Sequence, residues 1–537
     1  MPIDVSIQVL PEEAANPTVL QERIARKLGL NPSRLQGYRI HRQSIDARSR
    51  TVRINLSVKA FVDEAPQDRE PMFFRFEPLP TDARRVIIIG AGPAGLFAAL
   101  RLIEQGIRPI ILERGKDVKA RRRDLALLNR EGILNEDSNY CFGEGGAGTY
   151  SDGKLYTRSN KRGNIERILE LLVHFGADER ILFESHPHIG TNKLPGIIAA
   201  MRERIIACGG EVHFNQRVDR LDIDRSVLTA VHTRSGDHVA GDACILATGH
   251  SARDIFEMMA RQGLNIEAKP FALGVRIEHP QALIDAIQYH CPREGGRSPY
   301  LPPASYSLVE QVQQRGVFSF CMCPGGIIAT ASTAPGELVV NGWSPSKRNN
   351  PYANSGMVVQ VEQADAFRYL QRIRPGQYKA TDSLLMMHFQ QAVEQKAFQA
   401  GGGKFVAPAQ RMVDFTQRKV SSSLPPSSYI PGLESAGLDN VLPPFIYQAL
   451  SEGFLAFGRK MKGYYTNEAV VVATESRTSS PVRIPRDHET LQHTQIPGLF
   501  PCGEGPGYAG GIVSAAMDGE NCAIAVGRFL GQSTSGR

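Results

Sequence analysis

Residues 86–100 read VIIIGAGPAGLFAAL and residues 110–113 read IILE, so an apolar strand, a glycine-rich turn, an apolar helix and a second strand follow one another. Gly90 permits the tight turn, Gly92 lets the backbone approach a pyrophosphate, and Gly95 lets the helix pack closely on the strand. The beginning of the helix offers unpaired N–H groups and a positive dipole end to phosphate. This order predicts a Rossmann-like dinucleotide-binding domain.

The second strand of this unit ends in an acidic residue, Glu113. A carboxylate at this place accepts hydrogen bonds from the adenosine ribose hydroxyls, and it disfavours a ribose that carries a 2′-phosphate. We therefore expect a nucleotide other than NADP at this site.

The chain has 537 residues, more than one hydrophobic core usually supports, so we expect two or three domains. Its formal net charge of +7 is small for this length and does not by itself indicate a nucleic acid partner. No secretory signal pattern is visible, and the apolar stretch 86–102 is broken by glycines and Pro93. We expect a cytoplasmic protein without a membrane span.

Eight cysteines are scattered along the chain, and none of them forms a CxxC pair. This spacing predicts neither a disulfide framework nor a zinc site, so we expect no metal. Cys321 and Cys323 share one face of a predicted strand. A redox pair is one interpretation of them, and two small buried residues are the other.

The motifs divide the chain into an α/β protein with α+β parts. Residues 1–80 predict a small α+β domain that ends in a proline-rich linker. Residues 81–270 and 463–537 form the two parts of a discontinuous nucleotide-binding domain, because apolar strands that end in ATG (247–249) and GEG (503–505) recur far apart. Residues 271–462 alternate like strands and predict an inserted, β-rich cap domain.

A second glycine cluster lies at residues 139–155, which read NYCFGEGGAGTYSDGKL. Ordering so many glycines has a high entropic cost, so a ligand or a close backbone contact must require them. The functional interpretation is a loop laid against a planar or anionic ligand, with polar contacts from Thr149, Ser151 or Lys154. The alternative is a mobile surface loop.

The further motifs ATGHSARD (247–254), GVRIEHP (274–280), CMCPGG (321–326), ESRTSSPVR (475–483) and GEG (503–505) complete a pattern that spans nearly the whole chain. Together with the two glycine-rich segments, they resemble the glutathione-reductase-like FAD proteins that have one dinucleotide fold and an inserted cap. In particular, the chain resembles a family of bacterial FAD-dependent dehydrogenases known mainly as uncharacterised proteins.

The resemblance implies FAD as the cofactor and a set of residues that hold it. Many relatives have Asp at the position of Glu504. The implied cofactor-binding residues are Gly90, Gly92, Pro93, Ala94, Gly95, Glu113, Arg114, Gly145, Gly146, Thr149, Ser151, Asp152, Lys154, Val218, Ala247, Thr248, Gly249, Gly503, Glu504, Gly511 and Ile512.

Candidate catalytic residues are the polar groups expected where the cap meets the glycine loops. His250 follows the ATG motif directly, although a structural histidine explains it as well. Arg477 and Glu475 could hold an anionic substrate or the flavin edge, or they could pair with each other and fix a turn. Arg276 and Glu278 alternate with apolar neighbours in a cap strand, so they face either the active site or solvent.

We expect an FAD-dependent oxidoreductase that moves a hydride between flavin N5 and a small-molecule substrate, with NAD(P)H as a candidate electron donor. Disulfide reductases with two nucleotide-binding domains carry a second dinucleotide fingerprint and a CxxxxC pair of cysteines. This sequence has neither of them. One alternative is a flavin-dependent RNA-modifying enzyme, because residues 23–53 hold nine Lys or Arg against one acid, Asp46. Tyr38 is the one aromatic ring in that stretch, so we do not expect nucleic acid binding. The other alternative is a structural or regulatory flavoprotein.

Overall fold

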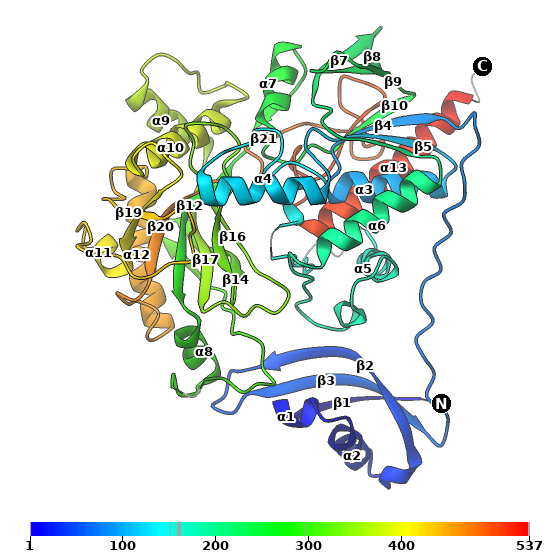
Figure 1. The fold of residues 1–537 in the computed structure, drawn as a ribbon, viewed down its shortest axis with the longest axis vertical. Coiled ribbons are helices and arrows are strands. Elements are labelled where there is room, and N and C mark those ends of the chain that lie inside the picture. Colours follow the sequence, from blue (N-terminus) through cyan, green and yellow to red (C-terminus); the bar gives the residue numbers. More distant parts are fainter. Residues whose placement is uncertain (1, 151, 158–162, 295, 535–537) are drawn as a thin grey trace.

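The computed structural model describes residues 2–150, 152–157, 163–294 and 296–534. Its three parts are the small N-terminal domain, the FAD-binding domain and the cap, as the sequence predicts (Figure 1). The FAD-binding domain is discontinuous, because strands from three distant segments share its parallel sheet.

The N-terminal domain is an antiparallel sheet in the order β1-β3-β2 with helix α2 on one face. Leu56 and Val58 point to the helix side and are buried, whereas their neighbours on the strand are partly exposed. Its elements are β1 (Ile3–Val9), α1 (Pro11–Ala14), α2 (Pro17–Leu28), η1 (Pro32–Arg34), β2 (Leu35–Asp46) and β3 (Arg53–Val62).

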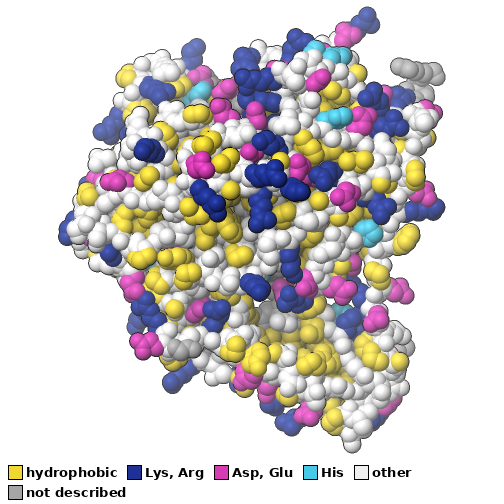
Figure 2. Space-filling model, in the orientation of Figure 1, with side chains coloured by type: hydrophobic (Ala, Val, Ile, Leu, Met, Phe, Trp, Pro, Cys, Tyr) yellow, Lys and Arg dark blue, Asp and Glu magenta, His cyan; other side chains and the backbone are white. Residues whose placement is uncertain are grey.

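Several of the basic residues in this domain are paired with acids. Arg23 pairs with Glu13, Arg34 with Asp63, and Arg48 with Asp46. The count over residues 23–53 overstates the free positive charge, because two of these acids lie outside that window. Figure 2 instead shows Lys and Arg side chains gathered over helix α4 (Val118–Glu131), whose sequence is VKARRRDLALLNRE.

The FAD-binding domain is built on a five-stranded parallel sheet in the order β22-β10-β4-β5-β6. The chain segment 86–102, which could suggest a membrane span, folds as a strand, a turn and a helix. Among the described residues, no helix has the length and apolar character needed to cross a membrane. The strands and their main helices are β4 (Arg85–Ile89), α3 (Pro93–Glu104), β5 (Arg108–Leu112), β6 (Glu211–His213), β10 (Ala243–Leu246), β22 (Leu499–Pro501) and α13 (Ile512–Thr534).

Two glycines of the fingerprint are required by this packing. A Cβ atom on Gly90, whose φ is +106°, would lie 2.5 Å from the carbonyl oxygen of Ala247, directly after the neighbouring strand β10. A Cβ atom on Gly95 would collide with the carbonyl oxygen of Gly90. The close helix–strand packing predicted from the spacing is therefore present.

The remaining elements of this domain surround the sheet. A three-stranded antiparallel meander, in the order β7-β8-β9, lies at one edge of the domain (Figure 1). These elements are η2 (Gly146–Gly148), α5 (Ile165–His174), η3 (Glu179–Leu182), α6 (Leu194–Ala207), β7 (Val218–Asp224), β8 (Val227–Thr233), β9 (His238–Ala240) and α7 (Arg253–Arg261).

The cap is a seven-stranded sheet in the order β13-β14-β17-β12-β20-β18-β19, antiparallel except for the pair β18 and β19. Helices α9, α10 and α12 lie on the side of this sheet that faces away from the FAD-binding sheet (Figure 1). The cap sheet comprises β12 (Phe271–Pro280), β13 (Val309–Val312), β14 (Arg315–Cys323), β17 (Tyr352–Val361), β18 (Ala407–Arg411), β19 (Leu433–Ser435) and β20 (Val470–Glu475).

Strand β20 belongs to the cap sheet although it follows residue 463, the boundary predicted for the cap. The chain thus returns to the FAD-binding domain only after this strand. The other cap elements and connections are β11 (Glu267–Ala268), α8 (Gln281–Tyr289), β15 (Ile327–Thr330), β16 (Val340–Trp343), α9 (Gln363–Ile373), α10 (Leu385–Ala400), α11 (Met412–Thr416), α12 (Pro444–Lys460) and β21 (Val482–Arg483).

Candidate cofactor and active site

One cavity, called the central cavity below, lies where the β4–α3 turn, the loops after β5 and β10, and the beginning of α13 meet the cap. Cap residues of β14 and β16 line its other side, together with the two residues that follow Ser476. Most of the residues predicted to hold the cofactor line this cavity. Those residues are Gly90, Gly92, Pro93, Ala94, Glu113, Arg114, Gly146, Asp152, Lys154, Val218, Ala247, Thr248, Gly249, Glu504, Gly511 and Ile512.

The turn between β4 and α3 presents backbone to the cavity. Gly92 is the N-cap of α3 and has no side chain to cap the first N–H groups of the helix, which therefore remain available to a phosphate. A Cβ atom on Gly92 would have only the Cα atom of Gly146 nearby, at 3.8 Å, so the turn is open on this side. Gly95 lies beneath the turn and does not line the cavity.

Glu113 joins three backbone segments at the rim of the cavity. Its Oε2 accepts a hydrogen bond from the N–H of Ala91 at 2.8 Å, and its Oε1 accepts from Gly115 at 2.9 Å and from Gly143 at 3.0 Å. The carboxylate thus fixes the phosphate-binding turn and the second glycine loop. The remaining lone pairs of its oxygens are the acceptors offered to a ribose.

A charged network closes the cavity near Glu113. Arg114 donates to Asp254 at 2.8 Å and to Asp137 at 2.6 Å, and its guanidinium lies 4.0 Å from the ring centre of Phe142. Arg217, directly before Val218, donates to the other oxygen of Asp254 at 3.0 Å. The sequence reasoning missed Arg217 and Asp254, although the first adjoins Val218 and the second ends the ATGHSARD motif.

Some residues of the second glycine loop line the cavity, and others support the loop from behind. Gly146 lines the cavity, whereas Gly145 donates its N–H to the carbonyl of Ala91 at 2.8 Å. Thr149 is buried and donates to the carbonyl of Glu144 at 3.1 Å, so it supports the loop. Ser151 lies outside the described residues.

Asp152 and Lys154 reach from this loop to the cap. Asp152 accepts hydrogen bonds from Ser344 and, at 2.5 Å, from Nη2 of Arg348. Lys154 donates to the carbonyl oxygen of Met322. Both residues line the cavity at the junction of the two domains, and both hold the cap against the glycine loop.

The cavity has features that fit a bound FAD. The Oγ1 of Thr248 is buried and has no hydrogen-bond partner among the described residues, although it lies at the cavity wall. Gly249 and Gly511 have left-handed φ values, and nothing lies within 4 Å of where their Cβ atoms would be. An unpaired hydroxyl beside open backbone is what a large polar ligand would satisfy. Gly503 instead donates its N–H to Asp518 at 2.8 Å behind the wall.

On the cap side, Asn341 is held in a fixed orientation. Its Oδ1 accepts from Nη2 of Arg276 at 2.6 Å and from the N–H of Gly342 at 2.7 Å. The amide NH2 group is therefore the part of Asn341 that remains to donate into the cavity. Asn341 escaped the sequence reasoning, although it is a polar residue within the apolar run LVVNGW of residues 338–343.

Cys321 and Cys323 both line the cavity from the end of β14. A β-bulge interrupts the register of β14 between Phe320 and Cys323, and Cys321 has a φ of +44°. Both cysteines are free, and the Sγ of Cys323 donates to the carbonyl of Cys321 at 3.3 Å. The bulge means that the two side chains do not follow the regular alternation from which a shared face was predicted.

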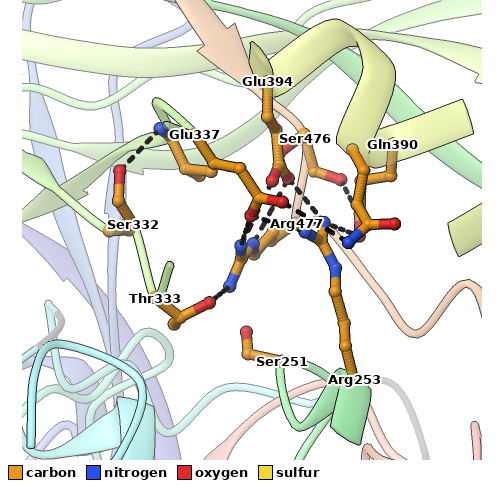
Figure 3. A network of polar contacts seen from close by, with 12 residues as sticks. Ser251, Arg253, Ser332, Thr333, Glu337, Gln390, Glu394, Ser476 and Arg477 are labelled. Atoms are coloured by element: carbon orange, nitrogen blue, oxygen red, sulfur yellow. Dashed lines mark hydrogen bonds and ion pairs between the residues drawn. The ribbon is translucent and has the colours of Figure 1, made fainter. Parts of the chain in front are cut away.

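Arg477 lines the cavity at the edge of a buried charged network (Figure 3). It donates to Thr333 at 2.7 Å and to Glu394 at 3.2 Å, and it also lies 3.5 Å from Glu337. Arg253, from the FAD-binding domain, contacts the same two carboxylates at 2.8 Å and 2.9 Å. The network therefore joins the two domains and fixes the position of Arg477.

Burial and the neighbouring charges together shift the pKa values of the groups in this network. Burial opposes ionisation of Glu394, but the adjacent guanidinium groups of Arg253 and Arg477 hold its pKa below the ordinary value. Burial raises the pKa of Glu337, and the neighbouring negative charge of Glu394 raises it further. Burial works against the charge of Arg477, yet Glu394 and other neighbours raise its pKa.

Glu475, which was also predicted to be catalytic, lies outside the network of Arg477. It is buried, does not line the cavity, and forms an ion pair with Arg276 at 2.5 Å. The predicted pair of Arg477 with Glu475 is absent, because Glu475 pairs with Arg276 whereas Arg477 pairs with Glu394 and Glu337. Arg276 and Glu278 are buried, so the interpretation that placed them in solvent is wrong.

His250 and Glu504 face each other across the cavity wall. Nε2 of His250 lies 3.6 Å from Oε2 of Glu504. Burial raises the pKa of Glu504 to about 7. Burial, followed by the charge of Arg477, lowers the pKa of His250 to about 4. Near neutral pH the imidazole is therefore neutral, and Glu504 can hold or release a proton.

Three family models match the chain. Residues 84–255 match pyridine nucleotide-disulphide oxidoreductases, residues 270–478 match the C-terminal domain of FAD-dependent proteins, and residues 1–61 match a domain of unknown function. An uncharacterised protein from Clostridium beijerinckii is 38% identical over 519 residues, which cover 93% of this chain and 94% of that protein.

Solved structures also resemble the chain at low identity. Glycine oxidase from Bacillus cereus is 13% identical, with a TM-score of 0.29 over 83% of this chain and 95% of that one. A tetracycline destructase is 13% identical, with a TM-score of 0.27 over 54% of this chain and 62% of that one.

The parallel sheet, its glycine turn and the matched domains define a protein of the FAD/NAD(P)-binding pyridine nucleotide-disulphide oxidoreductase class with an FAD-dependent C-terminal domain. The chain belongs to the same family as the uncharacterised Clostridium beijerinckii protein, and its matched domains are those of an FAD-dependent oxidoreductase.

Proposed function

We propose that the protein is an FAD-dependent dehydrogenase or reductase that moves a hydride between flavin N5 and a small molecule held between the cap and the flavin. The observation that carries this proposal is the central cavity, whose walls come from both domains. One side offers the glycine turn and the beginning of α3, and the other offers the side chains of the cap. FAD, when bound, supplies the hydride chemistry.

The residues near Glu113 would hold the nucleotide half of the cofactor. The first N–H groups of α3 would bind the pyrophosphate, and Glu113 would accept from the ribose. Asp254 holds Arg114 and Arg217 in place, so their side chains need not rearrange when a nucleotide binds at this end of the cavity. Such fixed side chains lower the entropic cost of binding.

Glu504, with His250 beside it, would transfer the proton that accompanies the hydride. Glu504, with a pKa of about 7, can hold a proton at Oε2 or release it near neutral pH. The neutral imidazole of His250, 3.6 Å away, is too weak a base to take that proton, and it would instead help to position the carboxyl group. We assign Glu504, positioned by His250, rather than Glu475, to proton transfer.

Arg477 and the amide of Asn341 would orient the substrate. Arg477 carries a fixed positive charge at the cavity wall, and it suits a carboxylate, another anionic group or an electron-rich flavin edge. Asn341 offers N–H donors to a carbonyl oxygen. Both side chains are held from behind by buried partners, which is how an active site limits the motion of its polar groups.

The experiment is an anaerobic visible spectrum of the purified protein before and after addition of NADH or NADPH. The proposal predicts an oxidised flavin band in the purified protein. Bleaching by a pyridine nucleotide would identify a reductase, and a persistent band that an organic donor bleaches would identify a dehydrogenase. A purified protein without flavin, which also fails to take up added FAD, would refute the proposal.

A further inference from the structure

A cluster of three metal-ligating side chains lies on the β7-β8-β9 meander, outside the residues that line the central cavity. Asp222 lies on β7, His232 on β8 and His238 on β9. Oδ2 of Asp222 lies 2.5 Å from Nε2 of His232 and 3.2 Å from Nε2 of His238. We propose that these three residues form a binding site for a first-row divalent metal ion, with zinc as the probe.

The register of the meander brings the three side chains together. His232 and His238 are directly opposite each other on antiparallel strands, and their rings are 4.7 Å apart. Asp222 is opposite Ala230, which places it diagonally next to His232 on the same face. The side chains of Asp222 and His238 thus converge over the central strand from its two neighbours.

The opposite face of the same strands is anchored in the protein core. Leu221 and Val231, which are paired across β7 and β8, are buried in the hydrophobic cluster of the FAD-binding domain. The cluster of ligands therefore faces outward from a fixed sheet. Figure 2 shows histidine side chains at the surface in the region of this meander. An ion can reach the site from solvent, since the side chains of Asp222, His232 and His238 are 30%, 24% and 54% exposed.

The donor set suits a borderline metal ion. Two imidazole nitrogens and one carboxylate oxygen are ligands that zinc, cobalt, nickel and copper accept. Three protein ligands leave at least one coordination position for water. All three donor atoms lie within 4.8 Å of one another, a separation that a tetrahedral ion with bonds of about 2.0–2.2 Å can bridge after small side-chain movements.

Arg220 is a positively charged neighbour of the three ligands, and part of its side chain has to move when a metal ion binds. Its Nε lies 3.2 Å from Oδ1 of Asp222, and its Nη2 lies 2.6 Å from Nε2 of His232. Binding of an ion to Nε2 requires Nη2 to move away. The side chain of Arg220 is 57% exposed, so it can do so while Nε remains beside Oδ1.

The sequence reasoning expected no metal because it relied on the spacing of the cysteines. The ligands here come from three strands and meet only through the sheet register. Val218, at the beginning of the same β7 strand, lines the central cavity. An ion at this site would therefore brace the strand that leads to the nucleotide end of that cavity.

The test is calorimetric titration of zinc into the purified, flavin-containing protein after treatment with a chelator. We expect one zinc ion per chain in the wild type. His232→Ala and His238→Ala should each weaken binding about tenfold or more, because each removes one ligand. The matched control is His213→Ala, which removes an exposed histidine that pairs with Glu211 elsewhere, and it should leave binding unchanged.

A second variant separates this site from another cluster of ligand atoms. Cys502, Asp518 and Cys522 also lie close together, but they are buried. Cys522→Ser should retain zinc binding if the meander is the site. Absence of zinc binding in the wild type would overturn the proposal, and so would binding that survives both histidine substitutions or disappears with Cys522→Ser. None of these outcomes depends on whether the enzyme reaction is assigned correctly.

Discussion

The two sides of the central cavity are made in different ways. The nucleotide side is a short contiguous segment, in which Gly90, Gly92 and Gly95 expose backbone and Glu113 ties the turn to its neighbours. The cap side is assembled from β14, β16 and the residues after β20, and its polar side chains are held by buried partners. The nucleotide side depends on glycines that expose the backbone, and the cap side depends on polar side chains that buried partners hold in place.

The largest effect is expected on the nucleotide side. Gly95→Val would force a side chain into the carbonyl of Gly90, and we expect loss of most bound FAD, because the turn and α3 could no longer pack together. The flavin-to-protein absorbance ratio after purification measures this. Gly196→Ala is the control, since it adds a Cβ atom in helix α6 where nothing lies within 4 Å. Full flavin content in Gly95→Val would contradict the account.

The next effect concerns the charged network of the cap side. Glu394→Ala removes one of the two carboxylates that the buried Arg253 and Arg477 share and leaves only Glu337 to balance both charges, so we expect a loss of about 3–5 kcal/mol in the free energy of unfolding. Urea denaturation followed by tryptophan and flavin fluorescence measures it. Arg368→Ala, which breaks an ion pair whose arginine is 70% exposed, should change stability by about 1 kcal/mol or less. Equal effects of the two substitutions would argue against the network.

A smaller, pH-dependent effect is expected for Glu504. Its pKa is raised from 4.5 to about 7, so the protonated form is favoured in the folded protein. The stability that this proton contributes is present below the unfolded pKa and is lost as the pH rises through about 7. Glu504→Gln should not show this fall when thermal midpoints are compared between about pH 5 and pH 8.

The control for that comparison is Glu203→Gln, because the side chain of Glu203 is 73% exposed. It should keep the pH dependence of the wild type. In Glu504→Gln, the rate of flavin reduction should also no longer change with pH near pH 7. A pH profile that is unchanged by this substitution would remove Glu504 from proton transfer.

The smallest effect is expected for Asn341→Ala. The loss of one oriented donor should weaken substrate binding by about tenfold or less, because a net hydrogen bond is worth about 0.5–1.5 kcal/mol. Steady-state kinetics should show this mainly as a raised KM. A fall in kcat with no change in KM would instead indicate that Asn341 acts on the reacting atoms.

The contrast between the two sides also explains what could be predicted from the sequence. The turn at residues 90–95, the acid at Glu113 and the return strands at 243–246 and 499–501 follow from local patterns that fix backbone geometry. The glycine loop was predicted as a whole, but Thr149 and Gly145 support it from behind, and neither lines the cavity. Local spacing does not determine which side of a loop meets the ligand.

The cap side could not be predicted in the same way. Arg477 pairs with Glu394 and Glu337, and Glu475 pairs with Arg276, so neither of the two predicted partners meets the other. These pairs bring together residues far apart in the sequence, and they depend on how the cap sheet, helix α10 and the connection before β16 pack together. The cavity role of Asn341 depends in the same way on Arg276 from another strand.

The most direct test is an experimental structure of the purified protein with the flavin that it retains. The account predicts one FAD per chain, with the pyrophosphate at the beginning of α3, the adenosine near Glu113 and Val218, and the flavin ring beside Asn341 and Cys321. A ring that lies away from the cap, or a cavity that binds a different cofactor, would contradict the account.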